Sequence, residues 1–122
     1  MKLFSLAIAP IALVIASSVA ASEGVGAVVT DAKKILVNGE GHKRSFPCNG
    51  RDLIVEGRSH TVSTTGVCRS VDVNGEKHTV IAEVAPNGKL IVGGTLHKVN
   101  WRSTGEPEQD LSGIDNKVQR LK

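Results

Sequence analysis

All four histidines of the chain stand at the last position of one repeated motif, Gly-x-x-His, whose fifth copy ends in asparagine. Successive copies start 18, 18, 19 and 19 residues apart. Self-similarity at a fixed period is typical of a chain that stacks one small unit on the next. The motif therefore predicts a repeat array, and it constrains the architecture far more than the activity. Its glycines are Gly39, Gly57, Gly75, Gly94 and Gly113, and its last positions are His42, His60, His78, His97 and Asn116.

Apolar residues recur at fixed distances from each motif glycine. These positions share one parity, which places their side chains on one side of a strand. The alternation around them indicates half-buried β-strands and not helices. Four residues before the glycine stand Ile35, Leu53, Val71 and Leu90, with Gln109 breaking the series. Two before it stand Val37, Val55, Val73, Val92 and Leu111, and five after it stand Arg44, Val62, Val80, Val99 and Val118.

Two all-β folds fit this pattern. We predict a small single-domain β-solenoid (a parallel β-helix) of about five coils of 18–19 residues, because stacking like on like produces columns of identical residues. The alternative is an antiparallel meander or sandwich, since Asn38-Gly39, Asn74-Gly75 and Asn87-Gly88 are dipeptides favoured in two-residue hairpins. In both folds the motif glycines supply the backbone freedom that the turns require.

The first 21 residues have the features of a cleaved secretory signal peptide. Lys2 gives a positive start, residues 3–19 are mostly apolar, and small residues around Ala20 suit signal peptidase. The apolar run is short for a membrane span, so we expect no span in the mature chain. We predict export to the periplasm or the medium, a cap or partial coil over residues 22–34, and the repeat domain over residues 35–122.

Charge and motifs argue against several functional classes. The formal net charge is +3, and basic residues alternate with acidic ones, which does not suit nucleic-acid binding. The chain has no serine nucleophile elbow, phosphate-cradling glycine loop or paired carboxylates at a known spacing, so we do not predict an enzyme. Glu40, Arg58 and Glu76 each follow a motif glycine. In stacked coils these charges would either pair along the surface or remain solvated.

The two cysteines, Cys48 and Cys68, are expected to form a disulfide in an exported chain. A bridge that closes a loop of about 20 residues would contribute about 3 kcal/mol on the chain-entropy model. The cysteines lie two register positions apart on adjacent repeats. A bulge or turn must therefore bring their Cα atoms within about 7 Å.

The repeated V-x-G-x-x-N-x-V pattern, with one cysteine pair, resembles a bacterial family known as domain of unknown function 3060 (DUF3060). The resemblance covers about residues 35–121, and its most telling segment runs from Cys48 to Gly75. Trp101 also stands where the family often has tryptophan. The resemblance implies an exported repeat domain with a β-solenoid fold, and it implies no activity. This chain departs from the family by carrying histidine where the family usually has asparagine.

The histidine column supports two hypotheses. In the first it is a structural ladder, because neutral imidazole has one donor and one acceptor and can replace an asparagine amide. In the second, adjacent imidazoles, with His60 and His78 as the best pair, bind Zn, Cu or Ni. A buried neutral column also predicts that stability falls below about pH 6. No other cofactor is expected.

From these observations we predict an exported, non-catalytic structural or binding module of the cell envelope, with a transition-metal-binding protein as the alternative. The partner is unknown. An envelope protein, or self-association through the exposed edges of the solenoid, would fit. Leu36, Ile54 and Ile91 share an outward-facing column and could add an apolar strip to such a surface.

Overall fold

The computed structural model describes residues 24–122, so the predicted signal peptide over residues 1–21 lies outside the described part. Within residues 24–122 the chain is all β and contains no helix. The strands are β1 (Val28–Thr30), β2 (Lys34–Val37), β3 (Lys43–Pro47), β4 (Asp52–Val55), β5 (Thr61–Val73), β6 (Thr79–Val92), β7 (Lys98–Arg102), β8 (Glu108–Leu111) and β9 (Lys117–Arg120).

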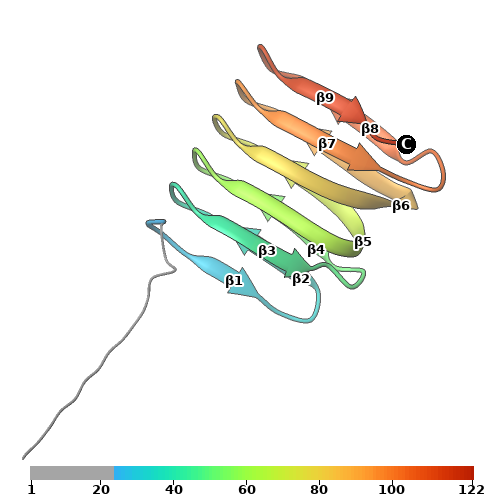
Figure 1. The fold of residues 1–122 in the computed structure, drawn as a ribbon, viewed down its shortest axis with the longest axis horizontal. Helices are drawn as coiled ribbons and strands as arrows, with labels where there is room; N and C mark the ends of the chain where they lie inside the picture. Colours follow the sequence, from blue (N-terminus) through green and yellow to red (C-terminus); the bar gives the residue numbers. More distant parts are fainter. Residues whose placement is uncertain (1–23) are drawn as a thin grey trace, which may run out of the picture.

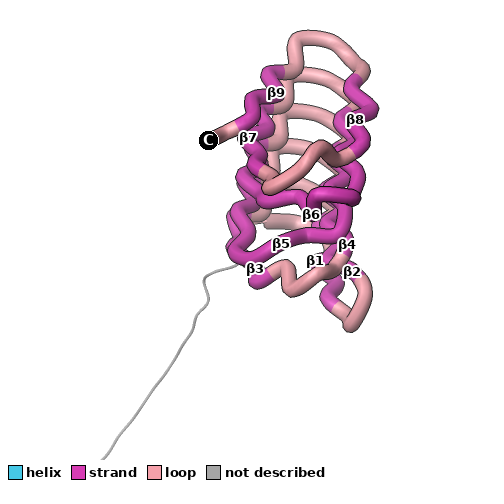
Figure 2. Tube along the Cα trace, turned by 90° about the vertical axis from the view of Figure 1, so that its right-hand side faces the viewer, coloured by secondary structure: helices cyan, strands magenta, loops and turns pink. Residues whose placement is uncertain are grey.

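The chain winds into a flattened solenoid whose coils stack along one axis (Figures 1 and 2). The first face is built from β2, β4, the C-terminal parts of β5 and β6, and β8. The second face is built from β3, the N-terminal parts of β5 and β6, β7 and β9. All these pairings are parallel, which confirms the predicted solenoid of about five coils. The antiparallel meander is wrong, because its hairpins would make neighbouring strands antiparallel.

The register is that of the sequence repeat. Leu53 pairs with Val71, and Val71 pairs with Leu90, so equivalent residues of successive copies lie side by side. The register shifts twice between β5 and β6, before Val67 and before Ser70. These bulges absorb the change of period from 18 to 19 residues without disturbing the columns on either face.

The apolar columns fill the narrow space between the two faces. The two first-face columns are buried through the first four repeats, and the second-face column is buried at Val62, Val80 and Val99, in the second to fourth repeats. Phe46 and Trp101 extend this core away from the motif, with exposed fractions of 6% and 3%. Arg44 and Gln109, which break the apolar columns in the sequence, are both exposed. The narrow core explains the preference for valine, because two strand faces this close leave little room for large rings.

The first coil is covered on one face by β1, the only antiparallel strand in residues 24–122. It pairs with β2, placing Val28 opposite Val37 and Val29 opposite Leu36. An isolated antiparallel bridge between Val25 and Glu40 continues this cover to the corner. The described part of the predicted N-terminal cap therefore lies against the first coil.

No helix in residues 24–122 is both long enough and apolar enough to cross a membrane.

Candidate functional site: a buried histidine ladder

The Gly-x-x-His motifs form the corner at which the chain passes from the first face to the second. Each motif glycine has φ between 89° and 105°, in the region that favours glycine. A Cβ at Gly57, Gly75, Gly94 or Gly113 would overlap the carbonyl oxygen of the preceding motif glycine. The corner therefore needs glycine for two reasons, its backbone conformation and its close packing on the coil before it.

The residue before each ladder position also has positive φ, at Gly41, Ser59, Lys77, Leu96 and Asp115. This second left-handed residue turns the next side chain into the interior. His60, His78 and His97 are fully buried, and His42 is 6% exposed. The predicted histidine ladder is therefore present, and it lies inside the fold at the corner.

The four imidazole rings stack on one another along the solenoid axis. Ring centroids are 5.0 Å apart for His42–His60 and His60–His78, and 4.9 Å apart for His78–His97. The last two pairs are nearly parallel, with interplanar angles of 3° and 2°. The separation is close to the spacing of adjacent strands, so the rings follow the backbone stacking.

The rings of His60, His78 and His97 each accept a hydrogen bond at Nδ1 from the backbone N–H of the ladder residue one coil earlier. This N–H has no carbonyl acceptor within its own corner, and a buried N–H must find a partner. The bonds run from His42 N to His60 Nδ1 (3.0 Å), from His60 N to His78 Nδ1 (3.2 Å), and from His78 N to His97 Nδ1 (3.1 Å).

The other ring nitrogen, Nε2, donates to the carbonyl oxygen four residues earlier. The acceptors are the carbonyls of Asn38 (3.1 Å), Glu56 (2.8 Å), Asn74 (2.7 Å) and Gly93 (2.6 Å). In His60, His78 and His97, Nδ1 therefore faces an N–H and Nε2 faces a carbonyl. This arrangement is satisfied only by the neutral tautomer that carries its proton on Nε2.

Asn116 makes the same two bonds with its side-chain amide. Its Oδ1 accepts from His97 N at 2.9 Å, and its Nδ2 donates to Ser112 O at 2.8 Å. The amide oxygen thus takes the place of Nδ1, and the amide nitrogen takes the place of Nε2. The structure assigns histidine and asparagine one shared role, which is to link each corner to the next.

Burial lowers the pKa of the three inner histidines, because the charged form loses its hydration. The pKa of His78 falls from 6.5 to about 4, with desolvation as the main cause and the neighbouring rings of His60 and His97 adding repulsion. Desolvation also lowers the pKa of His60 and of His97. These shifts agree with the hydrogen bonds, since a proton on Nδ1 would displace the N–H that it faces.

The ladder geometry gives little support to a metal site. The rings are stacked face to face, so their nitrogens point along parallel directions and do not converge on one point. Both nitrogens of each inner ring are already engaged, whereas a ligand nitrogen must offer a free lone pair to the metal. Within residues 24–122, no three His, Cys, Asp or Glu side chains are grouped so that they could hold a metal ion.

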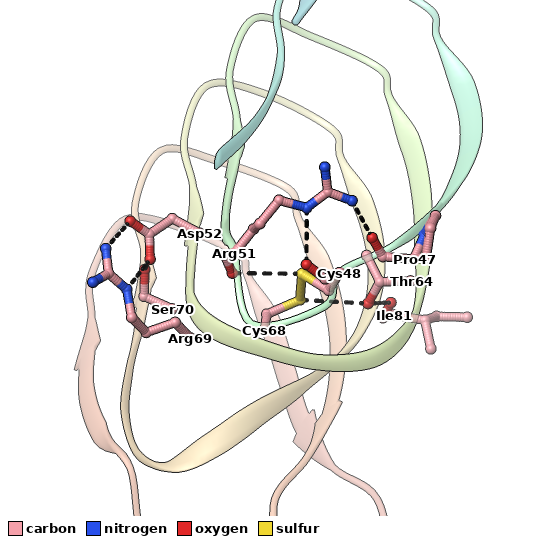
Figure 3. The surroundings of a disulfide bond; sticks show 9 residues. All are labelled: Pro47, Cys48, Arg51, Asp52, Thr64, Cys68, Arg69, Ser70 and Ile81. Carbon is pink, nitrogen blue, oxygen red and sulfur yellow. Dashed lines mark hydrogen bonds and ion pairs between the residues drawn. A yellow bond between two sulfur atoms is a disulfide. The ribbon is translucent and has the colours of Figure 1, made fainter. Parts of the chain in front are cut away.

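Cys48 and Cys68 form the expected disulfide between the first two coils, with Cα atoms 5.1 Å apart (Figure 3). Asn49 and Gly50, with φ of 50° and 76°, make the turn that closes the register offset. Arg51 holds this turn by donating to the carbonyl oxygens of Cys48 (3.0 Å) and Pro47. Both cysteines are fully buried.

A polar cluster beside the disulfide was not expected from the sequence. Arg69 donates to both carboxylate oxygens of Asp52, at 2.9 and 2.6 Å, and Ser70 donates to one of them at 2.8 Å (Figure 3). The guanidinium is the main reason that the pKa of Asp52 lies below its usual value. The sequence repeat could have predicted this cluster, because its register puts Asp52 opposite Ser70.

The structure also bears on two surface expectations. Glu40, Arg58 and Glu76 are joined by backbone bridges, but none of them belongs to an ion pair within the described chain. These side chains remain solvated at the corner. The outward column of Leu36, Ile54 and Ile91 is interrupted by Asp72, which pairs with Ile54 on one side and Ile91 on the other. The three apolar residues are half-buried, and Asp72 divides the strip between Ile54 and Ile91.

The comparisons with known proteins identify a family but no activity. A model of the family described as "Protein of unknown function (DUF3060)" matches residues 55–115. This match contains Cys68 and four of the five motif glycines, and it begins after Cys48. No curated protein and no solved structure matches the chain. Because this match covers half of the chain, the chain belongs to the DUF3060 family.

Proposed function

We propose that this protein is an exported, non-catalytic structural or binding module of the cell envelope, in which the histidines hold the coils together. Export is supported by the sequence of residues 1–21 and by the buried Cys48–Cys68 disulfide, a bond that persists in oxidising compartments. The rigid, flat-sided stack would serve as a spacer or as a platform for a partner.

The observation that carries this proposal is the complete use of the inner imidazoles inside the fold. In His60, His78 and His97, one nitrogen accepts from a backbone N–H and the other faces a backbone carbonyl. A general base or a metal ligand needs a free nitrogen that reaches a substrate or an ion. These rings are buried and fully bonded, so their chemistry supports a structural role.

Native mass spectrometry with added Zn²⁺, Cu²⁺ or Ni²⁺ tests the proposal against the metal-binding alternative. The native protein is compared with the double variant His60→Asn/His78→Asn, whose fold is expected to survive because Asn116 already occupies the equivalent position. We expect no stoichiometric metal that depends on the two histidines. Metal bound to the native chain and lost in the variant would contradict the structural role and establish a metal site.

A further inference from the structure

Within residues 24–122, the last coil leaves the core of the solenoid uncovered at one end. Along the column two residues before the motif glycine, the first four valines are at most 1% exposed, whereas Leu111 in the last coil is 47% exposed. On the facing strand, Val62, Val80 and Val99 are equally buried, whereas Val118 is only half-buried. The side chains of Leu111 and Val118 point inward like the rest of their columns. They lack the next coil, which covers the equivalent residue in every earlier repeat.

The backbone at this end is also available for pairing. In residues 24–122 no strand pairs with the outer edge of β8 or of β9. The backbone N–H of Asn116 has no acceptor in the described chain, although the same N–H in each of the four earlier copies donates one coil onward. The first coil differs, because β1 covers β2 there and Gly24 packs against the ring of His42. Open strand edges of this kind are templates for another strand.

The two open edges carry opposite charge. Strand β8 contains Glu108 and Asp110, and strand β9 contains Lys117 and Arg120. Arg120 is held within the coil by Glu106 and by the carbonyls of Ser103 and Gly105. Asp110 and Lys117 are exposed and belong to no ion pair in residues 24–122.

Symmetry makes this end complementary to itself. A two-fold axis parallel to the strands lays β8 of one copy antiparallel to β9 of a second copy, and repeats the contact on the other face. Because β8 ends and β9 begins at the same corner, this axis sets Asp110 and Leu111 over Lys117 and Val118 of the second copy. With inward Leu111 opposite inward Val118, the antiparallel register puts outward Asp110 opposite Gln119 and diagonal to outward Lys117, at a distance that a long lysine side chain can span.

The other ways of stacking two copies place like charges together. A two-fold axis perpendicular to the strands puts β8 on β8 and β9 on β9, so acid faces acid and base faces base. Head-to-tail stacking continues the column of Thr61, Thr79, Lys98 and Lys117, and brings Lys117 of one copy onto Lys43 of the next. Like charges placed directly opposite on neighbouring strands are destabilising.

We propose that the C-terminal end of the solenoid is a self-association surface, where two copies of this chain pair β8 with β9 about a two-fold axis. The surface completes the core over Leu111 and Val118 and neutralises Asp110 against Lys117 twice per dimer. This inference goes beyond the proposed function and uses no ladder ring nitrogen, so its test is independent of the metal experiment.

Analytical ultracentrifugation of the purified, disulfide-bonded protein at low salt tests the geometry, in a concentration series from micromolar to millimolar. The variants are Asp110→Lys and Lys117→Asp, and both should fold because both side chains are exposed; circular dichroism checks this. In a dimer of either variant, residues 110 and 117 carry like charges at both contacts. We therefore expect the dissociation constant to rise at least about tenfold. Lys43→Asp, at the other end of the solenoid, is the matched control and should change nothing.

Mixing the two variants gives the decisive result. An Asp110→Lys chain with a Lys117→Asp chain restores an opposite-charge pair at both contacts, so the mixture should dimerise although neither variant does alone. A native protein that stays monomeric up to millimolar concentration would overturn the proposal. A mixture that stays monomeric would also overturn it. Tighter association of Lys43→Asp, with no weakening in Asp110→Lys, would overturn it as well, because opposite charges at residues 43 and 117 favour head-to-tail stacking.

Discussion

The Nδ1 atom of His78 and the Oδ1 atom of Asn116 accept equivalent bonds, each from the N–H of the ladder residue one coil earlier. Their donor atoms, Nε2 and Nδ2, both face the carbonyl oxygen four residues back. At this position the imidazole therefore acts as an extended amide. Replacement by asparagine keeps both bonds, and replacement by an apolar side chain removes both.

The substitutions His78→Asn and His78→Leu should differ strongly in stability at pH 7.5. Leucine leaves the N–H of His60 and the carbonyl of Asn74 buried without partners, which we expect to cost about 3 kcal/mol or more. Asparagine keeps the bonds and loses part of the ring packing, so its cost should be about 1 kcal/mol. Urea unfolding monitored by circular dichroism measures both. Equal losses would show that packing, and not hydrogen bonding, is what the ladder contributes.

Acid should destabilise the fold through the buried histidines. The folded pKa of His78 is lowered from 6.5 to about 4, mainly by desolvation. Below pH 6.5 the unfolded chain therefore binds more protons than the folded chain, and stability falls as pH falls. The loss ends near pH 4, where folded His78 also binds a proton, and amounts to about 3 kcal/mol. Thermal melts at pH 7.5, 6 and 5 measure the slope.

The control for this pH dependence is His78→Asn, which should reduce the slope between pH 6.5 and 4 and leave the part contributed by His60 and His97, whose pKa values burial also lowers. Asp52 also has a lowered pKa, held by Arg69, but its contribution disappears only below its usual value of 3.8. The two effects therefore separate by pH. Identical melts at pH 5 and pH 7.5 for the native chain would mean that its rings can charge without cost, which contradicts their burial.

At the scale of the coil, the corner glycines differ from glycines elsewhere in what surrounds them. A Cβ at Gly75 would overlap the backbone carbonyl of Gly57, and Gly75 has φ of 104°. Gly50, in the turn after Cys48, has φ of 76° but no atom within 4 Å of its Cβ position. A side chain at either position would be conformationally strained, but only at Gly75 would it also clash with a neighbouring coil.

The pair Gly75→Ala and Gly50→Ala separates these two penalties. We expect Gly50→Ala to cost about 1 kcal/mol, the usual cost of a left-handed alanine. Gly75→Ala must also push two coils apart, so it should cost several kcal/mol or prevent folding. Denaturant unfolding compares the folded variants, and the yield of soluble protein reports a failure to fold. Similar, small losses for both would mean that the corner can open without breaking the stack.

The columns and the corner were predictable because each depends on spacing within one repeat. The parity of Val55 and Val62 about Gly57 indicated strands with one buried side, and the shared slot of the histidines indicated a ladder. The tautomer was not predictable, because the partner of His60 Nδ1 is an N–H that lies 18 residues earlier in sequence. Asn87-Gly88, read as a hairpin signal in the alternative fold, lies inside β6 at an irregular register. There the packing of Gly88 against the Arg69 carbonyl prevails over the local turn preference.

At the scale of the whole molecule, each coil contacts only its neighbours, so stability is shared unevenly along the axis. The inner coils are covered on both sides, whereas the first coil has a neighbouring coil on one side and the short strand β1 on part of the other. The Cys48–Cys68 disulfide links this first coil to the second. The bridge therefore secures one of the two end coils, which are covered by a neighbouring coil on one side only.

Replacing both cysteines, as in Cys48→Ala/Cys68→Ala, tests this placement. Loss of the cross-link should lower the free energy of unfolding by about 3 kcal/mol on the chain-entropy model. Because the bridge ties the first coil to the second, amide exchange should accelerate most in β2 and β3 and least in β6 and β7. Hydrogen exchange with mass spectrometry resolves these strands, and the native chain without reductant is the reference. Uniform acceleration along the chain would instead indicate that the solenoid unfolds as one cooperative unit and that the bridge acts on the unfolded state alone.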